Sequence, residues 1–276
     1  MSERLIIIGG GFNGQLLHTV FHRARVFDWR PSPPDLTAQP RQFGPQYLWE
    51  PVDGLACSPF VVTTHVDGRP ATDDAVRAYK RKVDKEQDAG DWRAQFQTTM
   101  QGWSVALPPS RVEYGRRIAS IDRVSRKLIM ANHEEVFYDI LISTIPLYSL
   151  LSLAGLPEPD TKLTFRPIYV SSSPCADAML SDGMYVNYIS DPDTPIYRET
   201  QRDAALHRES LHATDGVTIK ITPGKIYGHP AVPMLQNTLR AYGIHTFGRF
   251  ASWHPDELAH ETFRQALSFK VFYGIR

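Results

Sequence analysis

Three glycines and one aspartate have the types and spacing that could do the most specific chemistry. Gly9, Gly11 and Gly14 follow the apolar run Leu5–Ile8, and Asp28 lies nineteen residues after Gly9. At a strand-to-helix turn, such glycines allow a tight turn, close approach of a pyrophosphate and close packing of helix on strand. The N–H groups that begin the helix bind phosphates, and the aspartate accepts hydrogen bonds from ribose hydroxyls. The spacing predicts a dinucleotide site; the alternative is a glycine-rich turn without a ligand.

The elements that must position these residues follow from the flanking sequence. The apolar run has the length and composition of a strand buried on both faces in a parallel sheet. After the glycines, apolar residues recur at helical spacing and form one stripe: Leu16, Leu17, Val20, Phe21 and Ala24. A second strand over 25–28 completes a βαβ unit. We therefore predict an α/β fold with a Rossmann-like parallel sheet.

Strand and helix patterns continue along the chain. The predicted strands are 117–122, 127–130, 136–144, 165–171, 185–189 and 244–247. The predicted helices are one or two surface helices within 73–101, one at 234–242, and a last one with Pro255 as its first residue. We expect 1–35, 110–156 and 215–276 to form a cofactor-binding domain. We expect 36–109 and 157–214 to form a small interleaved substrate region.

Composition and charge argue against several classes of protein. Lys and Arg together number 30, as do Asp and Glu, so there is no overall positive field of the kind that marks a nucleic-acid-binding protein. Cys57 and Cys175 lack metal-ligand spacing, and the ten histidines form no HExxH pattern, so we predict no metal. The apolar run at the start is too short for an export signal, and we expect a soluble, cytoplasmic protein.

One polar segment carries a local concentration of basic residues. They lie within the predicted surface helix and are Arg77, Lys80, Arg81, Lys82 and Lys85. Such a run usually forms a solvated helix face; a surface that binds a polyanion is the alternative.

Three segments resemble a superfamily of FAD enzymes. Asp28-Trp29-Arg30 resembles the acidic-x-Arg end of the second strand in enzymes of the amine-oxidase type. Residues 138–147 resemble the late strand that returns the chain to the flavin domain in that group. Residues 243–253 are similar to the Gly-Arg-aromatic and Trp turn near the C-terminus of UDP-galactopyranose mutase and its relatives. The resemblance implies FAD as the cofactor and an FAD-binding role for the predicted parallel sheet; NAD is the alternative.

The resemblance also implies which residues contact FAD. They are Gly9, Gly11, Phe12, Asn13, Gly14, Asp28, Arg30, Ile118, Thr144, Gly248, Arg249 and Trp253. For Trp253, packing in the protein core is the alternative.

Candidate catalytic residues come from the segment that resembles the family's substrate-facing strands and from the C-terminal turn. The strand candidates are Tyr185, Asn187, Tyr188, Tyr197 and Arg198. The planar fork of Arg198 suits a carboxylate or a phosphate; the alternative is a surface arginine. Tyr197 is a catalytic candidate or a core residue, and His254 follows the Gly248-Arg249 turn.

Short phage-encoded FAD proteins that hypermodify thymine in DNA resemble this chain in size and motifs. The resemblance implies oxidation at the Cα of an N-linked glycyl group, followed by hydrolysis of the imine to glyoxylate and 5-aminomethyl-deoxyuridine. Arg198 would hold the glycyl carboxylate, and the basic helix would meet the DNA backbone. Two alternatives are a mutase-like enzyme acting on a nucleotide sugar and a non-catalytic nucleotide-binding module.

Overall fold

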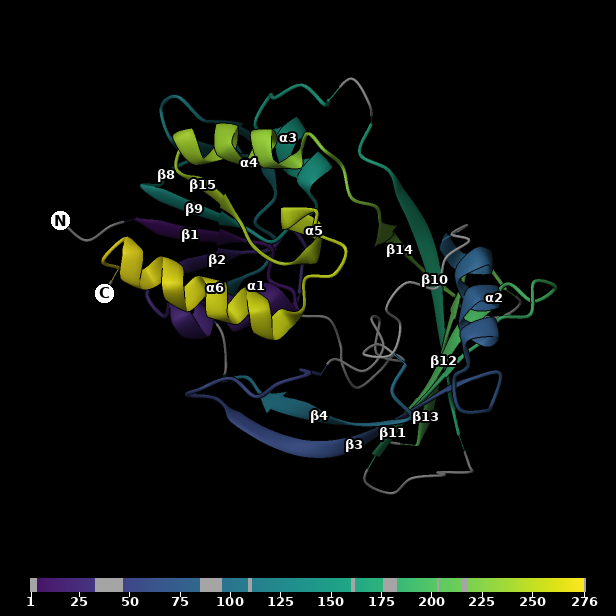
Figure 1. The fold of residues 1–276 in the computed structure, drawn as a ribbon. Coiled ribbons are helices and arrows are strands. Elements are labelled where there is room, and N and C mark those ends of the chain that lie inside the picture. The colour runs from purple at the N-terminus through teal and green to yellow at the C-terminus, as the bar shows by residue number, and fades with distance from the viewer. Residues whose placement is uncertain are drawn as a thin grey trace.

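A computed structural model describes most of the chain. The described residues are 4–32, 47–84, 96–108, 111–159, 162–175, 183–202, 204–214 and 218–275. They form a parallel sheet with helices on both faces and, beside it, a larger mixed sheet (Figure 1). Two long strands of the larger sheet, β3 (Ala56–Val66) and β4 (Thr99–Ala106), reach back beneath the helices of the parallel sheet (Figure 1).

The parallel sheet contains the two strands expected around the glycine turn. Its described strands lie in the order β15-β9-β1-β2-β5, and every neighbouring pair is parallel. Their bounds are β1 Leu5–Ile8, β2 Arg25–Phe27, β5 Val112–Glu113, β9 Ile140–Ser143 and β15 Ile244–Thr246. Ile7 pairs with Val26 on one side and Ile142 on the other. The predicted βαβ opening is confirmed.

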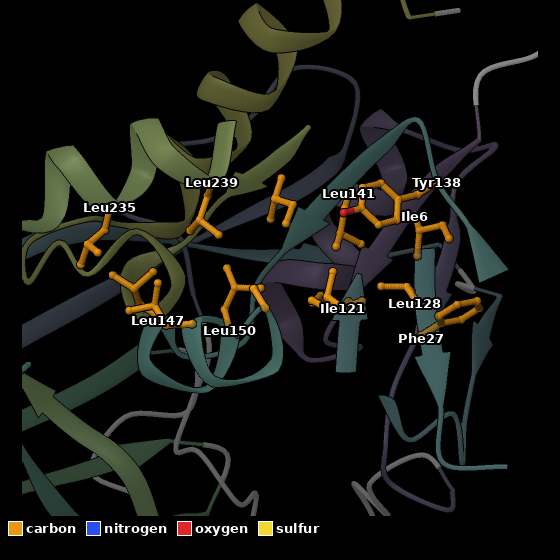
Figure 2. Close-up of a cluster of buried hydrophobic side chains, with 14 of the residues drawn as sticks. Ile6, Phe27, Ile121, Leu128, Tyr138, Leu141, Leu147, Leu150, Leu235 and Leu239 are labelled. Atoms are coloured by element: carbon orange, nitrogen blue, oxygen red, sulfur yellow. The ribbon is translucent and has the colours of Figure 1, made fainter. Parts of the chain in front are cut away.

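Alternate residues of β1 point into two separate cores, as strand geometry requires. Leu5 and Ile7 pack under α1 (Phe12–Val20) and α6 (Ala259–Phe272). Ile6 and Ile8 pack on the opposite face (Figure 2), against α3 (Leu147–Leu153), α4 (Val232–Ala241) and a small antiparallel sheet. Burial of each such side chain stabilises the fold by about 1.5–3 kcal/mol.

The small sheet and its surroundings contain Tyr138, one of the largest side chains with no solvent exposure. The strands of this sheet are β6 Ile118–Asp122, β7 Lys127–Met130 and β8 Glu135–Phe137. Its inward residues Ile121 and Leu128 lie with Tyr138 over the parallel sheet (Figure 2). This layer closes the second core.

The larger sheet has the strand order β14-β10-β13-β12-β11-β3-β4 in the described residues, with only β11 and β3 parallel. The remaining bounds are β10 Phe165–Pro174, β11 Gly183–Tyr188, β12 Ile196–Arg202, β13 Ala205–Ser210 and β14 Ile219–Ile226. Helix α2 (Asp73–Asp84) packs Val76 and Val83 against this sheet. Strand β14 belongs to this sheet, although the expected division by residue range groups 215–276 with the cofactor domain.

Three predicted elements have different bounds in the structure. The polar segment 73–101 contains α2 but ends in β4. The start of β4 is polar, like a surface helix, because β4 is an edge strand of the larger sheet. The run 136–144 is divided between β8 and β9, because Asp139 turns toward Arg4 and accepts its backbone N–H at 2.8 Å. The last helix begins at Ala259 rather than Pro255, since Glu261 caps the N–H of Leu258 at 2.8 Å.

In the part of the chain that the structure describes, no helix has both the length and the apolar composition needed to cross a membrane.

Candidate functional site

The glycine turn between β1 and α1 is tightly packed at two of its glycines. Gly9 has a φ of +99°, and a Cβ there would collide with the hydroxyl of Thr144. A Cβ on Gly14 would collide with the carbonyl oxygen of Gly9. Thr144 holds the turn from β9, because its hydroxyl donates to the carbonyl of Gly9 at 3.0 Å. Gly9 and Gly14 are therefore required by the turn itself.

Gly11 differs from its neighbours because it faces open space. A Cβ on Gly11 would have no heavy atom of the described chain within 4 Å. Its φ of −71° is accessible to any residue, so the backbone conformation does not require glycine here. Gly11 is also the N-cap of α1, and no side chain of the described residues caps that helix. The first N–H groups of α1 thus border an open space beside a glycine, which is the geometry of an anion site.

Asp28, at the end of β2, is buried and saturated with hydrogen bonds. It is 4% exposed. Its Oδ2 accepts the N–H of Gly10 at 2.8 Å, and both oxygens accept the side chain of Arg30, at 2.9 and 2.6 Å. Oδ1 also accepts the backbone N–H of Arg30 at 2.9 Å. Burial alone would raise the pKa of Asp28, but the bonds from Arg30 and Gly10 outweigh it and lower the pKa below its usual value.

A carboxylate has about four acceptor positions, and Gly10 and Arg30 fill them all. The predicted contact between Asp28 and ribose hydroxyls therefore requires the Arg30 side chain to move aside. That contact stays a prediction.

The C-terminal turn meets the glycine turn directly. Gly248, which precedes α5 (Arg249–Ser252), has a φ of +85°, and a Cβ there would collide with the side-chain amide of Asn13. The N–H of Gly248 donates to Glu257 at 3.0 Å. Glu257 is buried and also accepts the hydroxyl of Thr262 at 2.8 Å. Residues at both ends of the sequence are thus assembled at one edge of the parallel sheet, as the motif comparison predicts.

Trp253 and His254 close this turn in different environments. Trp253 is 2% exposed, donates its indole N–H to the carbonyl of Tyr227 at 3.0 Å and packs edge-on against Tyr148 and Phe165. The structure therefore favours packing over cofactor contact for Trp253. His254 is exposed, and its backbone N–H donates to the carbonyl of Arg249 at 3.1 Å.

Two further predicted cofactor residues lie near the turn or the second core. Phe12 begins α1 and is partly buried against the α1–α6 core. Ile118 begins β6, pairs with Met130 and packs at the margin of the core shown in Figure 2. A contact of Phe12 or Ile118 with the cofactor stays a prediction.

In the larger sheet, Arg198 is paired with an acidic residue that the sequence analysis does not single out. Arg198 on β12 lies directly opposite Glu209 on β13. The Nε and Nη2 of Arg198 both donate to Oε1 of Glu209, the first at 3.0 Å, and the hydroxyl of Tyr197 donates to Oε2. Burial acts to lower the pKa of Arg198, but Glu209 outweighs it and raises the pKa above its usual value.

Strand register divides the predicted strand candidates between two faces. Tyr188 pairs with Arg198, so the two share a face, whereas Asn187 pairs with Glu199 on the other face. Tyr185 shares that second face with Asn187 because the two are separated by one residue. Tyr188 belongs to an aromatic cluster, with its ring centroid 5.0 Å from that of Tyr79.

Arg249 and Arg198 bring the two sheets to a common site. Helix α5 lies on the side of the parallel-sheet layer that faces β10 and β14 (Figure 1). Burial lowers the pKa of Arg249, and the positive charge of Arg198 lowers it further. The guanidinium groups of Arg249 on α5 and Arg198 on β12 therefore lie close enough to interact electrostatically.

Tyr47 also belongs to this site and is absent from the sequence-based set. Burial, and secondly Tyr188, raise the pKa of Tyr47 to about 12. Its ring lies 5.9 Å from that of Phe60 on β3. Tyr47 and Glu209 come from segments without a local motif, so only the pairing of distant strands reveals them.

The basic helix is only partly free to meet a ligand. Lys82 donates to the carbonyls of Asp191 and Ile196, each at 2.6 Å, and so anchors the β11–β12 connection. Arg77 and Arg81 are exposed, and Lys80 is half-buried. Lys85 lies outside the described residues.

The fold of this chain is similar to that of solved proteins. A reduced UDP-galactopyranose mutase aligns with a TM-score of 0.66 and 14% identity, over 100% of this chain and 96% of that chain. A fatty acid isomerase from P. acnes that produces CLA aligns with a TM-score of 0.57 and 10% identity, over 98% of both chains. No protein-family model and no curated protein matches the sequence. These structural similarities confirm the predicted α/β fold.

Proposed function

We propose that this chain is an FAD-dependent enzyme that oxidises and cleaves a C–N bond. The observation that carries the cofactor assignment is the contrast between Gly11 and its neighbours. Gly9 and Gly14 are needed by the turn, whereas the space in front of Gly11 is open among the described residues and borders the uncapped N-terminus of α1. An ordinary structural turn has no need of glycine at Gly11, but a bound pyrophosphate does.

The residues fit FAD at three points. The N–H groups at the start of α1 would bind the pyrophosphate, and Asp28 would bind the ribose once Arg30 moves aside. The Gly248-Arg249 turn lies against Asn13, so it borders the same space from the C-terminal side. When bound, FAD supplies a two-electron acceptor for amine oxidation.

The chain's own residues would bind and orient an amino acid that is attached through its nitrogen. Arg198 would hold the carboxylate, and Arg249 would add a second positive charge nearby. The neighbouring rings of Tyr47 and Tyr188 would limit the access of water to the reacting Cα. Loss of a hydride equivalent and a proton from the Cα–N bond gives an imine, and water then releases the oxo acid and the amine.

For the substrate we propose an N-linked glycyl group on modified thymine in phage DNA, which would yield glyoxylate and 5-aminomethyl-deoxyuridine. Support comes from the resemblance of the motifs and from the paired arginines. Arg77 and Arg81 on α2 are exposed and would contact the phosphate backbone weakly.

The test uses the purified protein under anaerobic conditions. The visible absorbance band of oxidised flavin reports whether FAD is bound. We expect DNA containing glycyl-modified thymine to bleach that band and release glyoxylate, while free glycine reduces the flavin poorly. A colourless protein that retains no flavin absorbance after incubation with FAD and removal of the unbound FAD would refute the cofactor assignment and favour the non-catalytic module.

A mutase-like enzyme is the second candidate, and the proximity of Arg198 and Arg249 favours it, because a diphosphate can bridge two guanidinium groups. Such an enzyme would isomerise a nucleotide sugar only with pre-reduced flavin and without net redox change. If glycyl-modified DNA leaves the flavin oxidised while a UDP-sugar is isomerised, this alternative replaces the first.

A further inference from the structure

The pair formed by Arg198 and Glu209 is asymmetric in its exposure. The Glu209 side chain is 10% exposed, whereas that of Arg198 is 37% exposed. Glu209 is held from both sides, because Tyr197 donates to one carboxylate oxygen and Arg198 to the other. Glu209 is thus a fixed, inner anion behind a partly accessible cation.

Arg198 keeps one edge of its guanidinium for a ligand. Its Nε and one N–H of Nη2 point to Glu209. The described residues offer Nη1 no further hydrogen bond. Guanidinium groups bind carboxylates through two parallel N–H donors, and the Nη1–Nη2 edge supplies such a pair.

Any anion on that edge also feels the charge of Glu209 behind it. The attraction to Arg198 and the repulsion from Glu209 both grow with the charge of the ligand. Unit charges about 6–7 Å apart in a partly desolvated site change a binding constant by about tenfold or more per ligand charge. A dianion therefore loses about ten times more affinity to Glu209 than a monoanion does.

We propose that Glu209 is the specificity-determining residue of this site. It fixes the orientation of Arg198 and lowers the preference of the free edge for multiply charged ligands, which favours a monocarboxylate. This inference deepens the proposed function and rests on it. Glu209 weakens the binding of a diphosphate more than that of a monocarboxylate, and so it shifts the site toward an amino-acid substrate and away from a nucleotide sugar.

Other charged groups around the two arginines do not reproduce this arrangement. Glu257 is committed to Gly248 and Thr262 beneath the C-terminal turn. Asp256 is exposed beside Arg249. Within the described chain, Glu209 is the acidic residue that hydrogen-bonds to the guanidinium of Arg198.

The experiment compares two probe ligands on the FAD-loaded protein, so that FAD already fills the phosphate-binding turn. The probes are N-acetylglycine, with one negative charge, and inorganic pyrophosphate, with more than one. Binding is measured by isothermal titration and by the change in flavin absorbance. The variants are Glu209→Gln and the matched control Glu199→Gln, which breaks the Glu199–Arg208 pair (2.8 Å) on the opposite face of the same two strands.

Glu209→Gln should shift the ratio of the two dissociation constants toward pyrophosphate by about tenfold. Glu199→Gln should leave that ratio within about twofold of the wild-type value, because the charge of Glu199 lies on the opposite face of the sheet. If Glu209 had only a structural role, Glu209→Gln would weaken the binding of both ligands equally and leave the ratio of their dissociation constants unchanged.

Two results would overturn the inference: an unchanged ratio in Glu209→Gln, or an equal shift in Glu199→Gln. If Glu209→Gln does not fold, the double variant Arg198→Gln/Glu209→Gln removes both charges together. Undiminished binding of N-acetylglycine by that variant would also overturn it. The flavin spectrum, recorded before any probe is added, reports failure of the cofactor assignment separately.

Discussion

Gly11 is the position at which cofactor binding can be separated from fold stability. In Gly11→Val the new side chain enters open space, since no described heavy atom lies within 4 Å of its Cβ, and the φ of −71° accepts any residue. The change should therefore leave the protein folded. The same side chain would occupy the volume that a pyrophosphate needs in order to reach the N-terminus of α1.

The expected loss of affinity follows from the hydrogen bonds that would be broken. A charge-assisted hydrogen bond from a backbone N–H to a phosphate oxygen contributes about 1.5–3 kcal/mol. Displacement of the pyrophosphate from two such groups costs about 3–6 kcal/mol. The dissociation constant of FAD should therefore rise by about a hundredfold to ten-thousandfold. The loss of glycine as the N-cap costs only a few tenths to about one kcal/mol of stability.

Two glycine variants calibrate the result. In Gly14→Ala the added Cβ collides with the carbonyl oxygen of Gly9, so the protein should be destabilised with or without FAD. Gly228→Val is the matched control, because Gly228 also has open space around its Cβ position in the described structure but lies outside the turn. It should retain both stability and FAD.

The assay combines fluorescence titration of FAD with thermal unfolding of each apoprotein. We expect Gly11→Val to unfold at nearly the wild-type temperature and to bind FAD at least a hundredfold more weakly. Full flavin occupancy with an unchanged dissociation constant in Gly11→Val would refute the assignment of this turn as the phosphate site. Loss of the fold in Gly11→Val would refute the statement that a side chain at this position enters open space.

Four further variants test other interactions. Arg30→Ala frees the acceptor positions of Asp28, so this variant should bind FAD at least as tightly as the wild-type protein does. Asp28→Ala should bind FAD about tenfold more weakly in a titration, because it loses one charge-assisted hydrogen bond. Burial lowers the pKa of His245 to about 4, so the unfolded state binds a proton first as the pH falls. The unfolding free energy should drop by about 3 kcal/mol between pH 6.5 and 4, and denaturant melts of His245→Gln should lack that dependence. The hydroxyl of Tyr138 is buried without a hydrogen-bond partner in the described residues, so Tyr138→Phe should raise the unfolding free energy by about 1 kcal/mol; a loss of that size would contradict the absence of a partner.

The glycine turn could be predicted because its signature is local. The glycine turn depends on a strand and a helix that adjoin it in sequence, and both appear as expected. The C-terminal turn could be added only through a family resemblance, since Gly248 and Asn13 are far apart in the chain. Their contact confirms that the two motifs form one edge of the sheet.

The substrate half could not be predicted in the same way, because it depends on strand register. Arg198 was singled out for its chemistry, but its partner Glu209 lies on the next strand with no motif around it. A bulge between Ile196 and Arg198 shifts the pairing by one residue. A shift of one residue exchanges the two faces of a strand, so a sequence pattern alone cannot decide which side chains meet.

The same register determines what kind of anion the site can take. Were Arg198 opposite an apolar residue, its full charge would attract a diphosphate at least as well as a carboxylate. Because Glu209 stands opposite it and is itself fixed by Tyr197, the charge of Arg198 is largely compensated while the geometry of its free edge is kept. This compensation lowers the advantage of a diphosphate over a monocarboxylate, and the fixed orientation of the free edge is what a reaction at one Cα–N bond requires.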